Sequence, residues 1–156
     1  MHSVDVKLSG SLMIAAYSDK RALELVRMWR ASFERGVGLL DPHPLDDQLA
    51  FFHREVVPEN KVLLVLDDAE GPIAAFIAFS KEKVAQLYVH IDYQGRGIGK
   101  ALLDVAKRES SGRLHLFTFA RNTRACRFYE RNGFHEIGRG FESEWQLADV
   151  KYVWTR

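Results

Sequence analysis

A glycine-rich segment, YQGRGIGKALL at residues 93–103, lies directly before an apolar helical run. It places three glycines and two positive charges between Gln94 and Lys100. The start of a helix attracts phosphate, because its unpaired backbone N–H groups and the positive end of its dipole point at the anion together. The segment therefore predicts a binding site for a phosphate-bearing ligand, a device that several unrelated classes of protein share.

Two familiar nucleotide-binding loops do not fit this segment. The P-loop pattern G-x-x-x-x-G-K-[ST] meets Gln94 at its first position and Ala101 at its last, so no hydroxyl is left to hold magnesium. The dinucleotide pattern G-x-G-x-x-G, begun at either of the first two glycines, finds no glycine at its last position. What remains is Q-x-x-G-x-G, formed by Gln94, Gly97 and Gly99, between a strand-like LYV and an amphipathic helix.

A second motif, N-x-x-A-x-x-[FY]-Y-x-x-x-G-F, follows in the next strand and helix. Its positions are filled by Asn122, Ala125, Phe128, Tyr129, Gly133 and Phe134. With both motifs at this separation, the chain resembles the GNAT superfamily of acetyl-CoA-dependent N-acyltransferases. The resemblance covers about residues 60–135 well, and the flanking segments fit the same order of elements more loosely.

The resemblance implies that acetyl-CoA binds along the LYV strand and at the glycine loop. In this family a parallel strand pair splays apart, and the free main chain of the first strand bonds the pantetheine amides. The pyrophosphate oxygens then accept hydrogen bonds from the backbone N–H groups of residues 95–100, where the glycines have no side chain that would block the phosphate. The residues carried over as cofactor-binding are Leu87, Val89, Gln94, Gly95, Arg96, Gly97, Ile98, Gly99, Lys100, Asn122 and Tyr129.

Some of these residues also have a plainer explanation. Arg96 and Lys100 could be solvated side chains at a helix start, and Asn122 could cap the following helix as well as bond the pantetheine. Basic residues outnumber acidic ones in this part of a nearly neutral chain, which favours an anionic ligand. We expect one or two of three arginines to lie near the adenosine phosphate: Arg124, Arg127 and Arg131.

Acyl transfer from a thioester to an amine needs a neutral amine, a stabilised oxyanion and a protonated leaving thiolate. The family places a tyrosine beside the thioester sulfur, which here implies Tyr129 as the acid. A phenol with an ordinary pKa of about 10 can give its proton to a thiolate with a pKa of about 8.5. The alternative is that the Tyr129 ring simply packs beside Phe128 and its hydroxyl bonds elsewhere.

The general base is where the chain departs from the family. Many members carry a glutamate just before the LYV tripeptide, but Ala85 and Gln86 stand there in this chain. Gln86 could position a water, His90 at the strand end could take the proton, and Glu144 in the FESEW segment is a third catalytic candidate. A reaction without a base, on the small neutral fraction of the amine, is also workable.

The acceptor should contact the first two helices and the segment around residue 140, which vary in this family. Its pocket could be lined by Trp29, Phe33, His43 and Phe52, although their helical spacing is also typical of a core. An acidic residue such as Glu142 or Glu144 would favour a cationic amine.

These observations favour an N-acetyltransferase that moves an acetyl group from acetyl-CoA to a primary amine of a small molecule or peptide, by direct attack in a ternary complex. The alternative is a noncatalytic acyl-CoA binding or sensing module, which the missing strand glutamate supports and which Tyr129 and Asn122 oppose. A nucleotide-dependent transferase is disfavoured by the missing hydroxyl of the loop.

The elements that position these residues can be predicted from periodicity and turn chemistry. The pattern predicts an α/β fold of mixed α+β type, in a single domain over residues 1–156, with a mixed but mostly antiparallel sheet of about six to seven strands and flanking helices. The resemblance implies that this domain is GNAT-like and that a splayed parallel strand pair holds acetyl-CoA. Two helices precede the sheet, the first with an Asp19 cap and the second ending before Pro58. The elements expected are helices at 19–34, 45–56, 97–109 and 122–132 and strands at 61–66, 73–79, 84–91, 113–120, 134–140 and 150–155.

Composition and charge exclude several classes of protein. The chain has 156 residues, 47% of them hydrophobic, and a formal net charge of +1, so no global field steers it to nucleic acid or to an anionic membrane. No apolar run reaches the length of a membrane span, and MHSVDVKLSG lacks the apolar core of a signal peptide, which predicts a cytoplasmic protein. The single Cys126 and the histidine spacing predict no metal site. The closing strands could pair edges in a homodimer.

Overall fold

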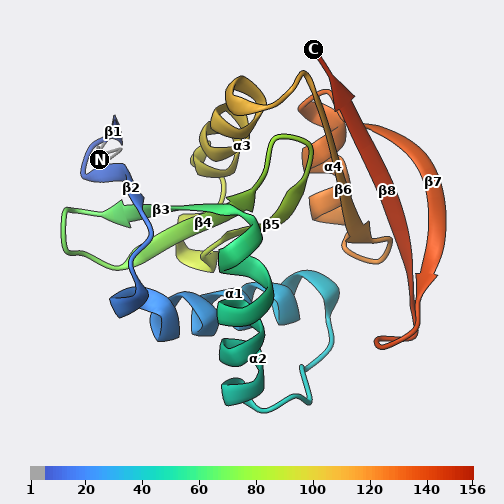
Figure 1. The fold of residues 1–156 in the computed structure, drawn as a ribbon, viewed down its shortest axis with the longest axis horizontal. Helices are drawn as coiled ribbons and strands as arrows, with labels where there is room; N and C mark the ends of the chain where they lie inside the picture. Colours follow the sequence, from blue (N-terminus) through green and yellow to red (C-terminus); the bar gives the residue numbers. More distant parts are fainter. Residues whose placement is uncertain (1–5) are drawn as a thin grey trace.

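Two antiparallel sheets diverge from one point in the fold (Figure 1). The computed structural model describes residues 6–156, so part of the segment MHSVDVKLSG lies outside the described residues. The first sheet has the order β1-β2-β3-β4-β5 and the second the order β6-β8-β7. The strands are β1 (Val6–Ser9), β2 (Leu12–Ala16), β3 (Lys61–Asp67), β4 (Ile73–Phe79), β5 (Val84–Val89), β6 (Arg113–Phe119), β7 (His135–Glu142) and β8 (Leu147–Thr155).

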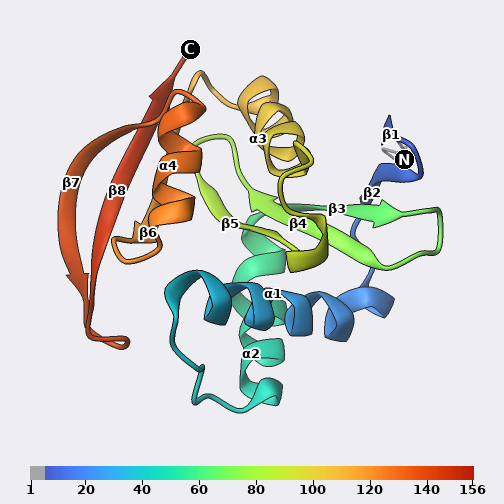
Figure 2. The ribbon, with the colours of Figure 1, turned by 180° about the vertical axis from the view of Figure 1, so that it is seen from behind.

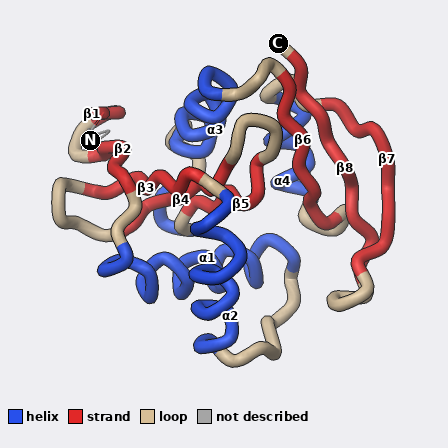
Figure 3. Tube along the Cα trace, viewed as in Figure 1, coloured by secondary structure: helices blue, strands red, loops and turns tan. Residues whose placement is uncertain are grey.

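The point of divergence lies between β5 and β6. These parallel strands meet through one isolated bridge, Lys83 with His115, where the His115 N–H donates to the Glu82 carbonyl at 3.0 Å. Beyond the bridge the strands separate into different sheets (Figure 3). The expected splayed strand pair is therefore confirmed, and the expected mixed sheet takes the form of two antiparallel sheets.

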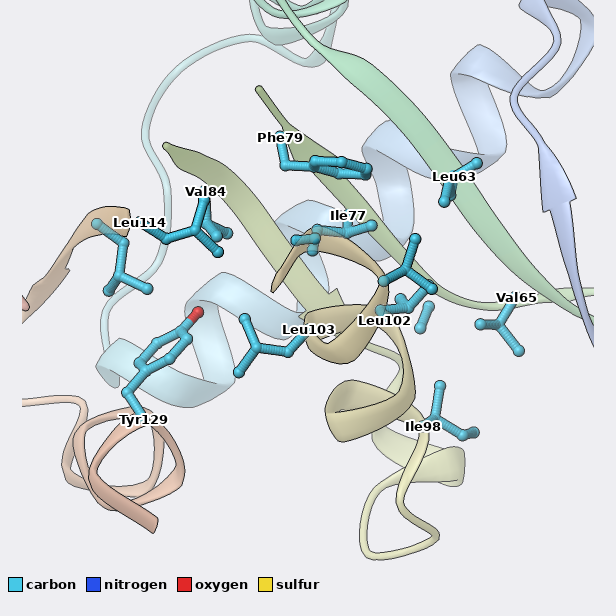
Figure 4. Packing of buried hydrophobic residues seen from close by; sticks show 14 of the residues in the cluster. Leu63, Val65, Ile77, Phe79, Val84, Ile98, Leu102, Leu103, Leu114 and Tyr129 are labelled. Carbon is cyan, nitrogen blue, oxygen red and sulfur yellow. The ribbon is translucent and has the colours of Figure 1, made fainter. Parts of the chain in front are cut away.

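Helices cover both faces of the first sheet, and α4 lies next to the second (Figures 1 and 2). The helices are α1 (Ala22–Val37), α2 (Leu45–Phe51), α3 (Ile98–Glu109) and α4 (Thr123–Arg131). Strand β3 alternates between two apolar clusters, so that Leu63 packs with α3 and Leu64 with α1. Figure 4 shows Leu102 and Leu103 of α3 beneath Ile77 of β4. Burial on both faces explains why β4 is apolar without alternation.

The N-terminal part differs from the sequence prediction, because β1 and β2 precede α1 and raise the number of strands to eight. The short run of β2 shows no alternation, and its structure depends on antiparallel pairing with the distant β3. A 3₁₀ turn at Asp19–Arg21 is capped by Ser18, whose hydroxyl accepts from the Lys20 N–H, so Asp19 is not the cap. After α2 the chain continues through a π turn at Phe52–Val56, which ends where the second helix was predicted to end, and then through a 3₁₀ turn at Val57–Glu59 that includes Pro58.

Candidate active site

The glycine loop presents free backbone donors at the start of α3. Gly97 is the N-cap residue with a φ of +77°, a left-handed conformation that favours glycine, and no side chain caps the helix. The first helical bond runs from the Ala101 N–H to the Gly97 carbonyl at 3.1 Å. The N–H groups of the first helical turn therefore have no partner within the helix and remain open to an anion.

Gly99 is required for a different reason, the close approach of α3 to its neighbours. A β-carbon at Gly99 would lie 3.2 Å from the ring of Phe128 on α4 and 3.5 Å from a methyl of Val89 on β5. Glycine thus lets the start of α3 sit against both the strand and the helix that border the groove.

The edge of β5 that faces away from β4 carries unpaired main-chain groups. The His90 N–H donates to the Ala74 carbonyl at 2.7 Å, which places the even-numbered residues on the β4 side. Main-chain groups of successive residues in a strand point to opposite edges, so those of Leu87 and Val89 point into the gap between the sheets. The Val89 carbonyl accepts from the Gln94 side chain at 3.1 Å. Gln94 thereby fixes the glycine loop to the end of β5.

A cavity of about 680 Å³ runs along this edge and over the glycine loop. Four basic residues line it, Arg35, Lys100, Arg124 and Arg131, and no acidic residue is among its described lining residues. The positive charge suits a phosphate-bearing ligand. Of the residues predicted to bind the cofactor, ten line the cavity: Leu87, Val89, Gln94, Gly95, Gly97, Ile98, Gly99, Lys100, Asn122 and Tyr129.

The structure places Arg96 differently. It is absent from the described lining of the cavity, its guanidinium donates to the Asp92 carbonyl at 3.3 Å and it lies 5.1 Å from the centre of the Tyr93 ring. Arg127 is likewise outside that lining. Lys100 lines the cavity while its ammonium pairs with Asp104 at 2.8 Å.

Tyr129 is buried between the first cavity and the second sheet. Figure 4 shows its ring projecting from α4 with the hydroxyl toward the side where Val84 and Leu114 begin the splayed strands. The ring packs 5.6 Å from that of Phe134. Burial, with smaller contributions from Tyr88 and Cys126, raises the pKa of Tyr129 above its ordinary value. The hydroxyl is therefore protonated in the physiological range and available as a donor.

A second cavity, of about 540 Å³, lies between α1, α2 and the β7–β8 turn. Trp29, Phe33 and Trp145 contribute aromatic walls, with ring centres of Phe33 and Trp145 4.9 Å apart. Its charge is opposite to that of the first cavity, since Arg54 and Lys83 are outnumbered by five carboxylates: Asp41, Asp47, Glu142, Glu144 and Asp149.

The two cavities meet at the gap between β5 and β6. They share a wall made of residues from the two splayed strands and the start of α4, namely Val84, Ala85, Gln86, Tyr88, Phe117, Thr118 and Asn122. Burial raises the pKa of the Tyr88 hydroxyl on this wall to about 12. The two cavities therefore adjoin each other at the splayed strands.

The predicted catalytic residues do not all meet there. Gln86 lines both cavities, and Tyr129 lines the first. Glu144 lines the second at its exposed end, with its side chain 65% accessible. His90 is outside the described lining of both cavities, and its Nδ1 accepts from the Asp92 N–H at 3.0 Å to cap the 3₁₀ turn at Ile91–Tyr93. Phe52 is fully buried in the core and is not among the described lining residues of the second cavity.

Comparison with known proteins decides the family. Residues 59–136, half of the chain, match the family model described as an acetyltransferase (GNAT) domain. This chain belongs to the GNAT family of acetyltransferases. The predictions of the family, of its mixed α/β fold and of an N-acetyltransferase are thereby confirmed.

Known proteins align with this GNAT chain over most of its length. It is 28% identical to the peptidyl-lysine N-acetyltransferase YjaB of Salmonella typhimurium over 74% of this chain and 78% of YjaB. The apo solution structure of YjaB from Escherichia coli superposes with a TM-score of 0.75 at 20% identity, over 92% of this chain and 97% of that one. The structure of the PaiA N-acetyltransferase from Thermoplasma acidophilum in complex with coenzyme A superposes with a TM-score of 0.74 at 17% identity. The match covers 94% of this chain and 100% of that one.

His43, named from the sequence as a possible lining residue of the acceptor pocket, lines the second cavity, but sequence reasoning missed its pairing with Asp41. An Asp41 carboxylate oxygen accepts from both the backbone N–H of His43, at 2.9 Å, and its ring Nδ1, at 2.7 Å. The signal was the spacing in DPHP, because an aspartate bonds readily to the backbone two residues further on. Trp145, which lines the second cavity together with His43, had no such local signal.

Sequence reasoning also missed an anchor of the glycine loop at Asp67, on the far end of β3. Its carboxylate accepts from the Tyr93 hydroxyl at 2.6 Å and from the Ser11 hydroxyl. These two bonds, that of Ser11 first, lower the pKa of Asp67 below its usual value. The anchor is therefore intact above the unfolded pKa of about 3.9 and is lost as pH falls through the lower folded value.

Asp67→Asn is expected to weaken coenzyme A binding several-fold at every pH from 5 to 8, because the amide offers one acceptor oxygen in place of two. Isothermal titration of coenzyme A measures this effect. The adjacent Asp68→Asn, at an exposed turn position with a φ of 78°, is the matched control. Equal affinity of the Asp67 variant and wild type would show that the anchor does not hold the loop.

Asn122→Ala separates the two roles of this side chain. The Asn122 Oδ1 accepts from the Ala125 N–H at 3.2 Å, as a cap of α4, and the residue also lines both cavities. Loss of the cap is expected to lower the free energy of unfolding by about 1 kcal/mol in urea. Asn122→Ser should restore the free energy of unfolding, because the serine hydroxyl can also cap α4. If the serine variant also recovers full coenzyme A affinity, Asn122 acts as a cap alone.

Within residues 6–156, no group of three or more His, Cys, Asp or Glu side chains is arranged to hold a metal ion. Over the same range, no helix combines the length and the hydropathy needed to cross a membrane.

Proposed function

We propose that this chain transfers an acetyl group from acetyl-CoA to a primary amine of a small molecule or a peptide, by direct attack in a ternary complex. The observation that carries the proposal is the wall shared by two cavities of opposite charge. We expect acetyl-CoA to enter through the first cavity and the amine through the second, so that the two substrates come together where the cavities adjoin.

The first cavity suits acetyl-CoA. Its basic lining and the free N–H groups at the start of α3 match the pyrophosphate, and open space surrounds the β-carbon positions of Gly95 and Gly97 in the loop before the helix. The open edge of β5 offers the main-chain groups of Leu87 and the N–H of Val89 to the pantetheine amides or to the oxyanion. Of the three arginines predicted to lie near the adenosine phosphate, Arg124 and Arg131 line this cavity, which supports that role for them.

Tyr129 is the proposed acid. As the amine attacks, the C–N bond forms, the C–S bond breaks and the departing thiolate takes the phenolic proton. Burial keeps the Tyr129 hydroxyl protonated, so it can donate to the departing sulfur as negative charge develops there. Gln86, which lines both cavities, is placed to hold the amine or a water through its amide.

The second cavity favours a cationic amine as the acceptor. Carboxylates outnumber basic residues on its wall, and aromatic rings such as Trp29 and Trp145 stabilise an ammonium group through their faces. The name of the relative YjaB, a peptidyl-lysine N-acetyltransferase, supports an amine on a flexible apolar stem.

Three broader predictions accompany this proposal. Residues 1–156 act as one N-acetyltransferase domain, the protein works in the cytoplasm, and a homodimer forms through the closing strands. The exposed β7, which lies at the edge of the second sheet, supports the last of these.

The test is release of coenzyme A thiol from acetyl-CoA across polyamines, amino acids, aminoglycosides and lysine peptides, with the acetylated product weighed by mass spectrometry. We expect acceptor-dependent release with cationic amines. Tight coenzyme A binding without acetyl transfer to any acceptor, lysine peptides included, would contradict the proposal and favour an acyl-CoA sensor.

A further inference from the structure

We propose that His43, oriented by Asp41, is the general base that takes a proton from the acceptor amine. This inference rests on the proposed function, because it assigns a role within that reaction. It supplies the role of the absent strand glutamate, because Ala85 and Gln86 offer no useful proton acceptor.

The pair has the geometry of a base and its orienting carboxylate. The His43 Nδ1 and an Asp41 carboxylate oxygen are 2.7 Å apart, and the same oxygen accepts the His43 backbone N–H at 2.9 Å. With Nδ1 donating to the carboxylate, the lone pair of the neutral ring is on Nε2. The ring is thus held in one orientation and one tautomer, as a general base requires.

Asp41 is itself fixed by its neighbours. Its side chain is 9% exposed, and its second carboxylate oxygen lies 3.7 Å from the Arg30 guanidinium on α1. Its backbone N–H donates to the Glu34 carboxylate at 2.6 Å. The loop between α1 and α2 is therefore pinned where it carries His43 into the acceptor cavity.

The other side of the imidazole faces that cavity and the solvent. His43 lines the second cavity, with its ring centre 5.4 Å from that of Trp145. Trp145 packs on Phe33, which packs on Phe119 at the end of β6, so this wall continues to the splayed strands. The side chain is 39% exposed, which gives the proton a way to bulk water.

Charged groups from several elements face the dyad. Glu144, on the β7–β8 turn, lies 3.8 Å from the His43 Nε2, and Arg30 faces Asp41 from α1. The remaining charges that line the same cavity come from α2 and the turn after it, the second sheet and the start of β5, and are Asp47, Arg54, Glu142, Asp149 and Lys83. Among the described lining residues of this cavity, His43 carries the sole imidazole, the side chain that serves most often as a general base.

The proton balance closes with the residues present. The acceptor arrives as an ammonium ion, and the His43 Nε2 takes one proton from it, directly or through one water. The amine then attacks the thioester carbonyl, the C–N bond forms and the C–S bond breaks. Tyr129 protonates the leaving sulfur and recovers a proton from the nitrogen of the new amide. One proton remains on His43 and leaves through its exposed side.

The experiment compares His43→Gln, Asp41→Asn and wild type in kcat/KM profiles against pH, with two acceptors. One acceptor is a strongly basic alkylamine and the other is a cyano-substituted amine that is largely neutral at the assay pH. We expect His43→Gln to lower kcat about 100-fold or more for the basic amine, to remove the acidic limb of its profile and to cost less than about tenfold for the neutral one. Imidazole added to His43→Ala should restore part of the lost rate.

Controls separate this role from folding and binding. His53→Gln, on the turn after α2 and outside the described lining of both cavities, should behave as wild type. Coenzyme A affinity and the thermal melting curve of the His43 variant should match wild type. Asp41→Asn should lower kcat in the same direction by a smaller factor, since it misorients the ring without removing it.

Three results would overturn the proposal. They are a His43 variant that changes KM and leaves kcat intact, an equal loss with both amines, and loss of the acidic limb in His90→Gln in place of His43→Gln. Failure of the proposed function looks different, because wild type would then acetylate no amine at all and the dyad would have no reaction to serve.

Discussion

Tyr129→Phe is expected to lower kcat for acetyl transfer by about 100-fold or more, with the coenzyme A dissociation constant within about twofold of wild type. The substitution removes the hydroxyl at the end of the first cavity and keeps the ring that packs against Phe134. The thiolate would then leave without a positioned donor. Steady-state thiol release with a saturating amine measures the effect.

The pH dependence of Tyr129 has a definite sign. Burial raises its pKa above the ordinary value of about 10, so the acid form persists through pH 9 and its ionisation causes no alkaline fall of kcat below about pH 10. Tyr17→Phe is the matched control, because the Tyr17 hydroxyl is buried without a hydrogen-bond partner among residues 6–156. An unchanged kcat in Tyr129→Phe would remove the residue from the acid role.

Gly99→Val is expected to lower the free energy of unfolding by about 1–3 kcal/mol and to weaken coenzyme A binding roughly tenfold or more. The new β-carbon would lie 3.2 Å from Phe128, and its methyl groups would press on Val89. The start of α3 must then move away from β5, which displaces the N–H groups that face the pyrophosphate.

The matched control for that effect is Gly138→Val. Nothing lies within 4 Å of a β-carbon at Gly138, which stands on the exposed strand β7. Valine suits a strand, so stability and coenzyme A affinity should both stay near wild type. Urea denaturation and titration of coenzyme A check both variants. If both glycine variants behave alike, close packing at Gly99 is not what shapes the groove.

Local chemistry explains which elements could be predicted from the sequence. Helix α4 begins after its Asn122 cap and ends before Gly133, as the motif predicted, because each signal lies within a few residues of the boundary. Strands β1 and β2 were missed because each has few residues and depends on pairing with a partner, which for β2 is the distant β3. The spacing of apolar residues within a strand does not show which distant strand it pairs with.

The same distinction applies to the two halves of the candidate site. The cofactor side is encoded by contiguous motifs, and ten of its predicted residues line one cavity. The acceptor side is assembled from segments far apart in the chain, such as His43, Phe117 and Trp145. The Asp67 anchor, 26 residues before Tyr93, likewise has no sequence pattern. The roles of the individual site residues stay predictions until the variants are measured.

We expect acetyl-CoA and the amine to occupy the two cavities at once and to react where these cavities adjoin. Initial rates of thiol release, with acetyl-CoA and the best amine varied together, distinguish this ternary complex from a two-step transfer. We predict intersecting double-reciprocal lines, as a ternary complex requires. Parallel lines, with an acetylated enzyme trapped in the absence of amine, would contradict the account, because the acetyl group would then pass through a covalent intermediate.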